Sequence, residues 1–230
     1  MNIIDVVVIL VILMSGVVGF KRGVFKEIVM TIGFLLVFII SFALKNPLAN
    51  WLALNLPFFN FGNFFSGVRI INIILYQFIA FLIIFSLIMI IFKIVLAVTN
   101  VFEKILKFTI ILGIPSKILG LIVGLIEGYI LGFIIMFFFS GPMFGGITDT
   151  SNLKDKMLNN TPILTPVVKE MNDTIIDIYN LKDKKNDPDE LEIEITKVML
   201  KHKLINYDYI IKLKDTGKIN IDEKTIEEYK

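Results

Sequence analysis

The chain has 230 residues, of which 56% are hydrophobic, and a mean hydropathy of +0.79. This composition is too apolar for an ordinary soluble domain and indicates a membrane protein. The formal net charge of +2 conceals a division, because residues 1–140 carry nine basic and four acidic residues, whereas residues 141–230 carry 14 and 17. The absence of cysteine excludes disulfides, thiol nucleophiles and cysteine metal sites. We therefore predict a membrane domain, 1–140, followed by a soluble tail, 141–230.

The first apolar run, Ile3 to Phe20, resembles a signal peptide only in its position. It lacks a basic leading region and ends in Lys21-Arg22 rather than at a small-residue cleavage site. We interpret it as a retained first membrane helix. A second apolar run, 28–44, follows after a very short turn, so we expect these two antiparallel helices to be neighbours.

The turn between these two runs is charged. Its charged residues are Lys21, Arg22, Lys26 and Glu27. Positive charge in short loops marks the cytoplasmic side of a membrane protein, which predicts that the turn lies inside and the N-terminus outside. Gly23 suits a tight turn, and we expect Glu27 to pair locally with Lys21 or Arg22.

The segment 45–69 contains only two basic residues but many aromatic ones, which predicts an outer loop lying in the headgroup layer. A ligand cage is the alternative. The aromatic residues are Trp51, Phe58, Phe59, Phe61, Phe64 and Phe65. A third membrane helix is expected over 70–92. The next run, 94–112, is interrupted by Glu103, Lys104 and Lys107, a pattern that favours an interfacial helix over another span.

A fourth membrane helix is expected over 118–139, and its glycines recur at four-residue intervals. They are Gly120, Gly124, Gly128 and Gly132. Such a stripe lets another helix backbone approach closely in lipid. Its partner is either the first helix, where Ser15, Gly19 and Gly23 repeat the small-residue spacing, or a second copy of the chain, which would make the protein a homo-oligomer.

Glu127 is the only charged residue of the fourth span. It follows Lys117 by roughly 15 Å of helix, which would put it near the bilayer midplane, where we expect no basic residue. An acid at this depth suggests a proton relay or transport site. The alternative is a protonated carboxyl group that hydrogen-bonds Ser15 or Ser86.

The predicted inner loops hold seven basic residues and the outer loop holds two. This asymmetry predicts that both the N-terminus and the tail lie outside the cytoplasm. The inner lysines would attract anionic membrane lipids. Their dispersal among aliphatic residues argues against nucleic-acid binding.

The tail shows helical periodicity near 151–158, 166–181 and 189–204, and a further helix is expected over 207–216, ending at Gly217. These segments predict a small helical domain or a set of docking helices for an unknown envelope or secretion protein.

Catalytic patterns are missing from the sequence. A serine protease needs a histidine base, and the one histidine, His202, lies in a lysine-rich helix without a nucleophile motif nearby. The sequence contains no phosphate loop, dinucleotide fingerprint or metal-ligand motif. We expect no enzymatic activity and no cofactor.

The membrane half resembles a known family in the order of its small motifs. Those motifs are Asp5, Arg22-Gly23, Lys26-Glu27 and Gly120, Gly124 and Gly128. In this order they resemble the colicin V production protein (CvpA-like) family of bacterial membrane proteins over roughly residues 1–140. The resemblance implies a four-helix, multi-pass protein of the bacterial plasma (inner) membrane. It also implies a link to toxin production or export and to envelope maintenance, without a settled molecular activity.

Two positions depart from the pattern of the family. Ser116-Lys117 stands where relatives commonly carry an acid and a base, and Glu127 stands where they commonly carry a basic residue. Some relatives fuse the same membrane unit to an extracytoplasmic serine protease, which agrees with an outward tail.

Together these features predict an all-α membrane protein with four transmembrane helices, interfacial helices and a small helical soluble tail. The expected function is that of a non-enzymatic helix-packing scaffold with a partner-binding tail. The alternative is a small transporter or channel subunit that uses Glu127. A membrane-anchored hydrolase is a third class and would require activity in the tail.

Overall fold

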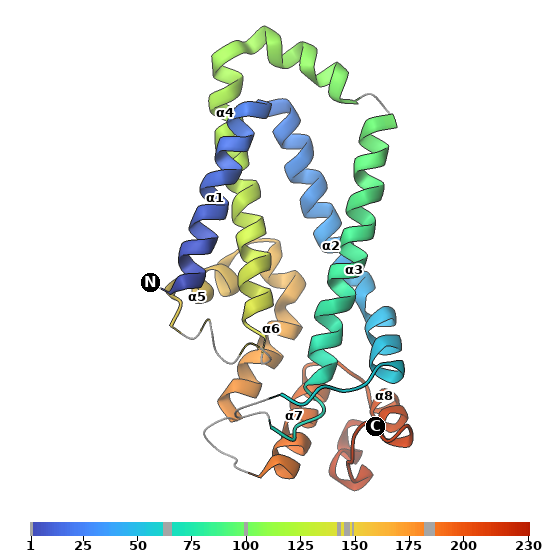
Figure 1. The fold of residues 1–230 in the computed structure, drawn as a ribbon. Coiled ribbons are helices and arrows are strands. Elements are labelled where there is room, and N and C mark those ends of the chain that lie inside the picture. The colour runs from blue at the N-terminus through green and yellow to red at the C-terminus, as the bar shows by residue number, and fades with distance from the viewer. Residues whose placement is uncertain are drawn as a thin grey trace.

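A computed structural model describes residues 2–61, 66–98, 101–141, 144, 148, 150–181 and 187–230, without the side chains of 101–112. All regular secondary structure in these residues is helical (Figure 1). The long helices are α1 (Ile3–Arg22), α2 (Val24–Asn55), α3 (Asn72–Val98) and α4 (Val101–Phe139). The tail contains α5 (Asn152–Asn160), α6 (Leu164–Leu181), α7 (Pro188–Lys201), α8 (Tyr207–Asp215) and two 3-10 turns, Glu223–Thr225 and Glu227–Tyr229.

Four helical segments of the described chain are long and apolar enough to cross a membrane: α1, α2, α3 and the Gly113–Phe139 part of α4. The predicted all-α, four-span class is confirmed. Helix α4 bends at Gly113, where φ is 53° and ψ is −127°. Its first part, 101–112, runs across the ends of the other helices in Figure 1, as an interfacial helix would. The side chains of Glu103, Lys104 and Lys107 lie outside the described residues.

The bundle has two different ends (Figure 1). The turn end carries the α1–α2 turn and the first part of α4, and the tail end carries the N-terminus, the α2–α3 connection and the tail. Helix α4 lies between α1 and α2, while α3 packs mainly on α2. The expected neighbours α1 and α2 contact each other only to a small extent, because α1 packs along the glycine-bearing face of α4.

A single residue, Gly23, separates α1 from α2. Its φ of 78° lies in the region that favours glycine, and its N–H donates to the carbonyl of Gly19 at 2.9 Å. The first N–H of α2, on Val24, donates to the hydroxyl of Ser116 at 3.3 Å. Ser116 thus supplies from α4 the helix cap that a glycine cannot provide.

Helix α2 extends well past the predicted end of the second span at residue 44. Lys45, the charged residue that directly follows the apolar run 28–44, is buried in the structure. Its Nζ lies 4.0 Å from the centre of the Phe42 ring and donates to Asn46 Oδ1 at 3.1 Å. Because the protein itself accommodates this charge, the helix need not end there. Residues 45–55, including the exposed Trp51, are therefore helical and not part of a loop, which is a correction.

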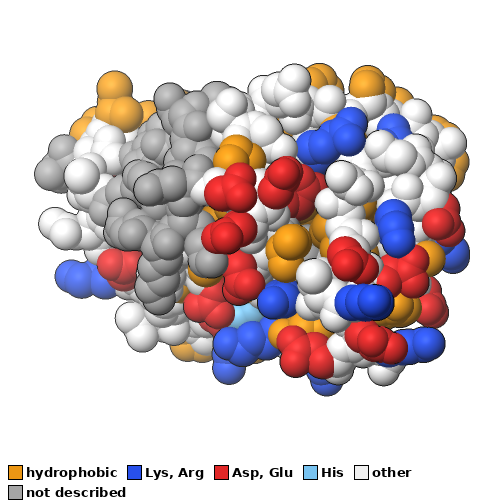
Figure 2. Space-filling view, turned by 90° about the horizontal axis from the view of Figure 1, so that it is seen from below, with side chains coloured by type: hydrophobic (Ala, Val, Ile, Leu, Met, Phe, Trp, Pro, Cys, Tyr) orange, Lys and Arg blue, Asp and Glu red, His pale blue; other side chains and the backbone are white. Residues whose placement is uncertain are grey.

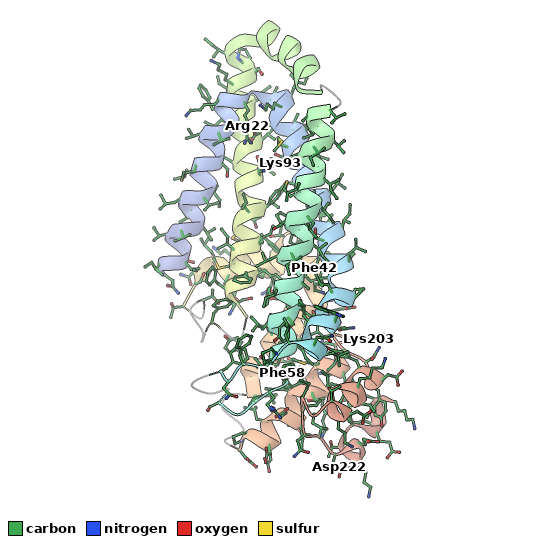
Figure 3. All side chains as sticks on the ribbon, turned by 45° about the vertical axis from the view of Figure 1, so that its right-hand side comes forward. Arg22, Phe42, Phe58, Lys93, Lys203 and Asp222 are labelled. Carbon is green, nitrogen blue, oxygen red and sulfur yellow. The ribbon has the colours of Figure 1, made fainter. Side chains whose placement is uncertain are left out.

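Phenylalanines join α2, α3 and α4. The ring of Phe38 packs edge-on against Phe81 at 5.6 Å and against Phe133 at 6.2 Å between centroids. Phe42, labelled in Figure 3, packs on Phe137 at 5.9 Å. Each such pair contributes about 0.5–1.5 kcal/mol beyond area burial. Of the aromatic segment predicted after residue 45, Phe64 and Phe65 lie outside the described residues.

The tail helices coincide closely with the segments that periodicity indicated, and Gly217 follows α8 with a φ of 68°. Their apolar faces do not form a separate core. Met157, Val168 and Ile175 belong to the same buried cluster as Phe133 and Phe137 of α4. The division into domains at residue 140 stays a prediction.

Candidate functional site

Helices α1 and α4 cross with their backbones in direct contact, at a place that we call the glycine crossing (Gly19, Gly120 and Gly124). A Cβ atom on Gly120 would overlap the carbonyl oxygen of Gly19, and one on Gly124 would overlap that of Ser15. Further along α4, a Cβ on Gly128 would lie 2.7 Å from Ile12 Cα. Of the two partners left open for the stripe, the structure has α1 of the same chain.

At Gly132, the last glycine of the stripe, α1 and α4 are in contact through a side chain. A Cβ on Gly132 would lie 2.8 Å from Cγ1 of Val8, which is a side-chain atom and not part of the backbone. The closest backbone approach is therefore at Gly120 and Gly124, near the turn end.

A charged cluster of Arg22, Glu27 and Glu127 adjoins the glycine crossing. Arg22 Nη1 lies 3.4 Å from Glu27 Oε2 and 3.6 Å from Glu127 Oε2. The Glu27 side chain has no exposed surface, and its Oε1 has no hydrogen-bond partner among the described residues. That oxygen would lie 3.1 Å from a Cβ on Gly19 or Gly124. The absence of side chains at the crossing therefore makes room for a buried carboxylate.

The expected local pairing of Glu27 with Arg22 is confirmed, but the expected surroundings of Glu127 are wrong. A basic residue does reach this acid. Side chains of a helix lean toward its N-terminus, and α1 and α4 are antiparallel, so Arg22 leans toward the membrane centre while Glu127 leans toward the turn end. The two side chains converge from opposite directions, which counting the helical rise along one helix does not reveal.

The cluster faces a cavity of about 320 Å³ between α1 and α4. Arg22, Glu127 and Ser15 provide its polar lining. The remaining lining is apolar: Val11, Met14, Val18 and Leu131. Ser15, one of the two alternative hydrogen-bond partners of Glu127, thus shares the cavity with it, although the ion pair is with Arg22.

The other predicted residues of the turn lie around this cluster. Lys21 is exposed, and Lys26 lines a second cavity on the α3 side together with Arg22 and Lys93. Figure 3 shows Arg22 and Lys93 at the turn end, on different helices.

A second polar region, which the sequence did not indicate, joins the membrane helices to the tail. The Ser151 hydroxyl donates to Asp5, a residue of α1 with only 1% exposure. Tyr129 of α4 hydrogen-bonds Thr161 at 2.7 Å. Asp5 also accepts the N–H of Asn2 at 2.9 Å and completes a capping box, which is the one part of this arrangement that spacing could have predicted.

The α2–α3 connection contacts the tail through a buried acid. The N–H of Arg69 donates to Glu192 Oε2 at 3.4 Å, and Glu192 Oε1 has no hydrogen-bond partner among the described residues. Burial raises the pKa of Glu192 to about 7, against the opposing attraction of Arg69. Close by, Lys218 Nζ donates to the carbonyl of Leu56 at 2.7 Å.

His202 is paired with an acid. Its Nε2 lies 2.7 Å from Asp177 Oδ2, and Lys201 Nζ lies 3.8 Å from the same oxygen. The pair joins α7 to α6. Within the described part of the chain, no three metal-binding side chains are grouped so as to hold an ion.

A family model described as colicin V production protein matches residues 4–170. The chain belongs to the colicin V production protein family. A search of curated proteins and a search of solved structures found no significant match. With four helices suited to crossing a bilayer, this member of the colicin V production family is a multi-pass membrane protein.

The match reaches further than the resemblance over 1–140. It includes α5 and the first part of α6, and therefore the contacts Asp5–Ser151 and Tyr129–Thr161. At the two positions that depart from the family pattern, the structure shows local contacts. Ser116 caps α2, and Glu127 pairs with Arg22.

Proposed function

We propose that this protein is a non-enzymatic component of toxin production or export, or of envelope maintenance, in which the membrane helices act as a scaffold for the tail. The supporting framework is the membership in the colicin V production family. The glycine crossing fixes α1 on α4, and α1 in turn contacts α5 through Asp5 and Ser151.

One observation carries this proposal: apolar residues of α5 and α6 share a buried cluster with the membrane helices, while the outer surface of the tail carries charged residues. Figure 2, which views the molecule from the tail end, shows acidic and basic side chains spread over that surface. Its exposed acids at the C-terminal end include Asp208, Asp215, Asp222, Glu223, Glu227 and Glu228. A charged surface of this kind suits recruitment of an envelope or secretion protein by electrostatic complementarity.

The same arrangement bears on catalysis and on self-association. His202 is engaged with Asp177 in holding α7 on α6, which favours a structural role for the histidine. Because α1 occupies the glycine stripe, a homo-oligomer would pack through another lipid-facing surface.

The proposed orientation puts the turn end in the cytoplasm and the tail outside, in the bacterial plasma membrane. The turn end carries the basic residues Lys21, Arg22, Lys26, Lys93 and Lys117, whereas Lys45 lies in the second half of α2 and Arg69 in the α2–α3 connection. The positive-inside tendency supports this orientation.

A second candidate function is a small transporter or channel subunit that uses Glu127. It is favoured by the charged cluster, because two carboxyl groups share one guanidinium group beside a cavity of about 320 Å³. Ionisable residues within membrane helices often mark ion or proton pathways.

Substitution of Glu127 separates the two functions. In cells that depend on this protein for toxin secretion, Glu127→Gln should leave secretion within about twofold of wild type if the protein is a scaffold, because a glutamine oxygen still accepts from Arg22. Loss of secretion at a normal protein level would support the transporter. Movement of toxin or ions by purified wild-type protein in liposomes would overturn the scaffold proposal.

A further inference from the structure

We propose that a cavity between α2 and the tail binds a neutral saccharide. The cavity has a volume of about 600 Å³, within the range of roughly 300–1,000 Å³ that is usual for small-molecule sites. It is lined by the second half of α2, by the connection between α7 and α8, and by residues of α8 and the C-terminal end. None of its described lining residues belongs to the charged cluster, and saccharide binding would be independent of the function proposed above.

The turn between α7 and α8 shapes one wall of this cavity. Lys203, labelled in Figure 3, follows α7 with a φ of 56°, in the left-handed region where glycine is the usual residue. The chain then reaches Asn206, whose side-chain oxygen accepts the N–H of Tyr209 at 2.9 Å and caps α8. The turn thus brings Asn206 and Tyr209 to the cavity. Asn46 and Asn50, one helical turn apart on α2, line it as well.

The hydroxyl group of Tyr209 is a buried polar group without a partner. The side chain is only 6% exposed, and its oxygen makes no hydrogen bond to any residue that the structure describes. Buried hydroxyl groups are nearly always hydrogen-bonded, because leaving the bond unmade costs free energy. Since Tyr209 lines the cavity, a hydroxyl group of a bound ligand can supply this bond.

The other polar groups of the lining suit a ligand that both donates and accepts hydrogen bonds. Asn46 and Asn206 use their side-chain oxygens as acceptors within the protein, and their NH2 groups can donate to a ligand. The amide of Asn50 offers a donor and an acceptor. Tyr207 and Tyr229 add aromatic rings, whose faces can pack against the C–H groups of a sugar ring.

The charge of the lining favours a neutral ligand. Lys203 is the one charged residue among the lining residues that the structure describes, and it is exposed. A cation would find no carboxylate there, and a phosphate group would find a single lysine. A purely apolar ligand would leave the amides and the Tyr209 hydroxyl unpaired. A sugar combines hydroxyl groups with apolar ring faces. In the proposed orientation the cavity lies on the outer side of the membrane, which fits a glycan of the cell envelope.

Binding can be measured with the full-length protein in an amine-oxide detergent, which has no sugar head group. The disaccharides N,N′-diacetylchitobiose and cellobiose serve as probes in titrations followed by saturation-transfer NMR, and at least one of them should bind. Tyr209→Phe should weaken this binding about tenfold, as expected for one lost hydrogen bond. Because the hydroxyl group has no partner within the described chain, Tyr209→Phe should not lower the thermal stability.

Tyr76→Phe is the matched control, because the Tyr76 hydroxyl lies outside the cavity lining and donates to the carbonyl of Pro57 at 2.6 Å. It should lower the thermal stability and bind the sugar like wild type. Asn50→Leu replaces an amide in the α2 wall by an apolar group of similar size and should also weaken binding. This variant keeps the site testable if Tyr209→Phe does not fold.

Three results would overturn the site: no binding of either sugar by the folded wild-type protein, unchanged binding in either folded cavity variant, or an equal loss of binding in Tyr76→Phe. Displacement of the sugar by the neutral peptide N-acetyl-trialanine amide would indicate a peptide site and overturn the saccharide assignment.

Discussion

At the scale of single residues, Glu192 is the acid whose burial has a measurable consequence in the tail. Its pKa rises from 4.5 to about 7 because burial disfavours the charged form, so the folded chain keeps a proton that the unfolded chain releases. The free energy of unfolding should therefore fall as the pH rises between about 4.5 and 7. Glu192→Gln should remove this loss and stabilise the protein by on the order of 2 kcal/mol above that window.

Unfolding of the purified protein in detergent across this pH range measures the effect. Glu194→Gln is the matched control on the same helix, because Glu194 is only partly buried and pairs with Lys197 at 3.2 Å. It should retain the pH dependence of wild type. The same pH dependence in Glu192→Gln as in wild type would mean that Glu192 does not keep its proton in the folded chain.

The charged cluster shows which residue contacts a sequence can predict. The pairing of Arg22 with Glu27 could be predicted because the two lie five positions apart across a one-residue turn. The contact of Arg22 with Glu127 could not, since it depends on how closely α1 approaches α4 and on the opposed lean of two long side chains. Glu192 and Arg69 were likewise too far apart in sequence for their contact to be expected.

At the scale of helices, the contacts of the glycine stripe predict that alanine substitutions destabilise the protein by different amounts along α4. A methyl group on Gly124 would overlap a backbone oxygen, which cannot move without shifting α1, whereas one on Gly132 would meet the side chain of Val8, which can adjust. Gly124→Ala should therefore destabilise the protein by about 1–3 kcal/mol, and Gly132→Ala by clearly less. Thermal unfolding in detergent provides the comparison.

Ile126→Ala is the control for this pair, because Ile126 lies on the same helix and is 52% exposed. It should unfold close to wild type. If Gly124→Ala and Gly132→Ala were equally stable, the tight backbone contact at the crossing would not be what holds α1.

Helices were easier to predict than their ends and their neighbours. Long apolar runs determined the four spans, and periodicity located α5 to α8. Helix α2 continues past the predicted end at residue 44, because Phe42 and Asn46 accommodate the charge of Lys45 within the helix. The short turn at Gly23 suggested that α1 and α2 pack together, but the flat face of α4 attracts α1 instead.

At the scale of the whole molecule, the tail and the N-terminus lie at the same end of the bundle, joined through Asp5 and Ser151. Nothing local in the sequence predicts this contact, because it joins residues 146 positions apart. Once it forms, however, the N-terminus and the tail must lie on the same side of the membrane. Any measurement that locates the tail therefore fixes the orientation of the entire chain.

The absence of cysteine allows that measurement with one reactive residue at a time. Lys224→Cys lies at the tail end and Lys117→Cys at the turn end, and both positions are exposed. A membrane-impermeant thiol reagent added to intact cells should label position 224 and leave position 117 unlabelled, and lysis should expose both. The reverse pattern would put the tail in the cytoplasm and replace the search for an envelope partner with one for a cytoplasmic partner.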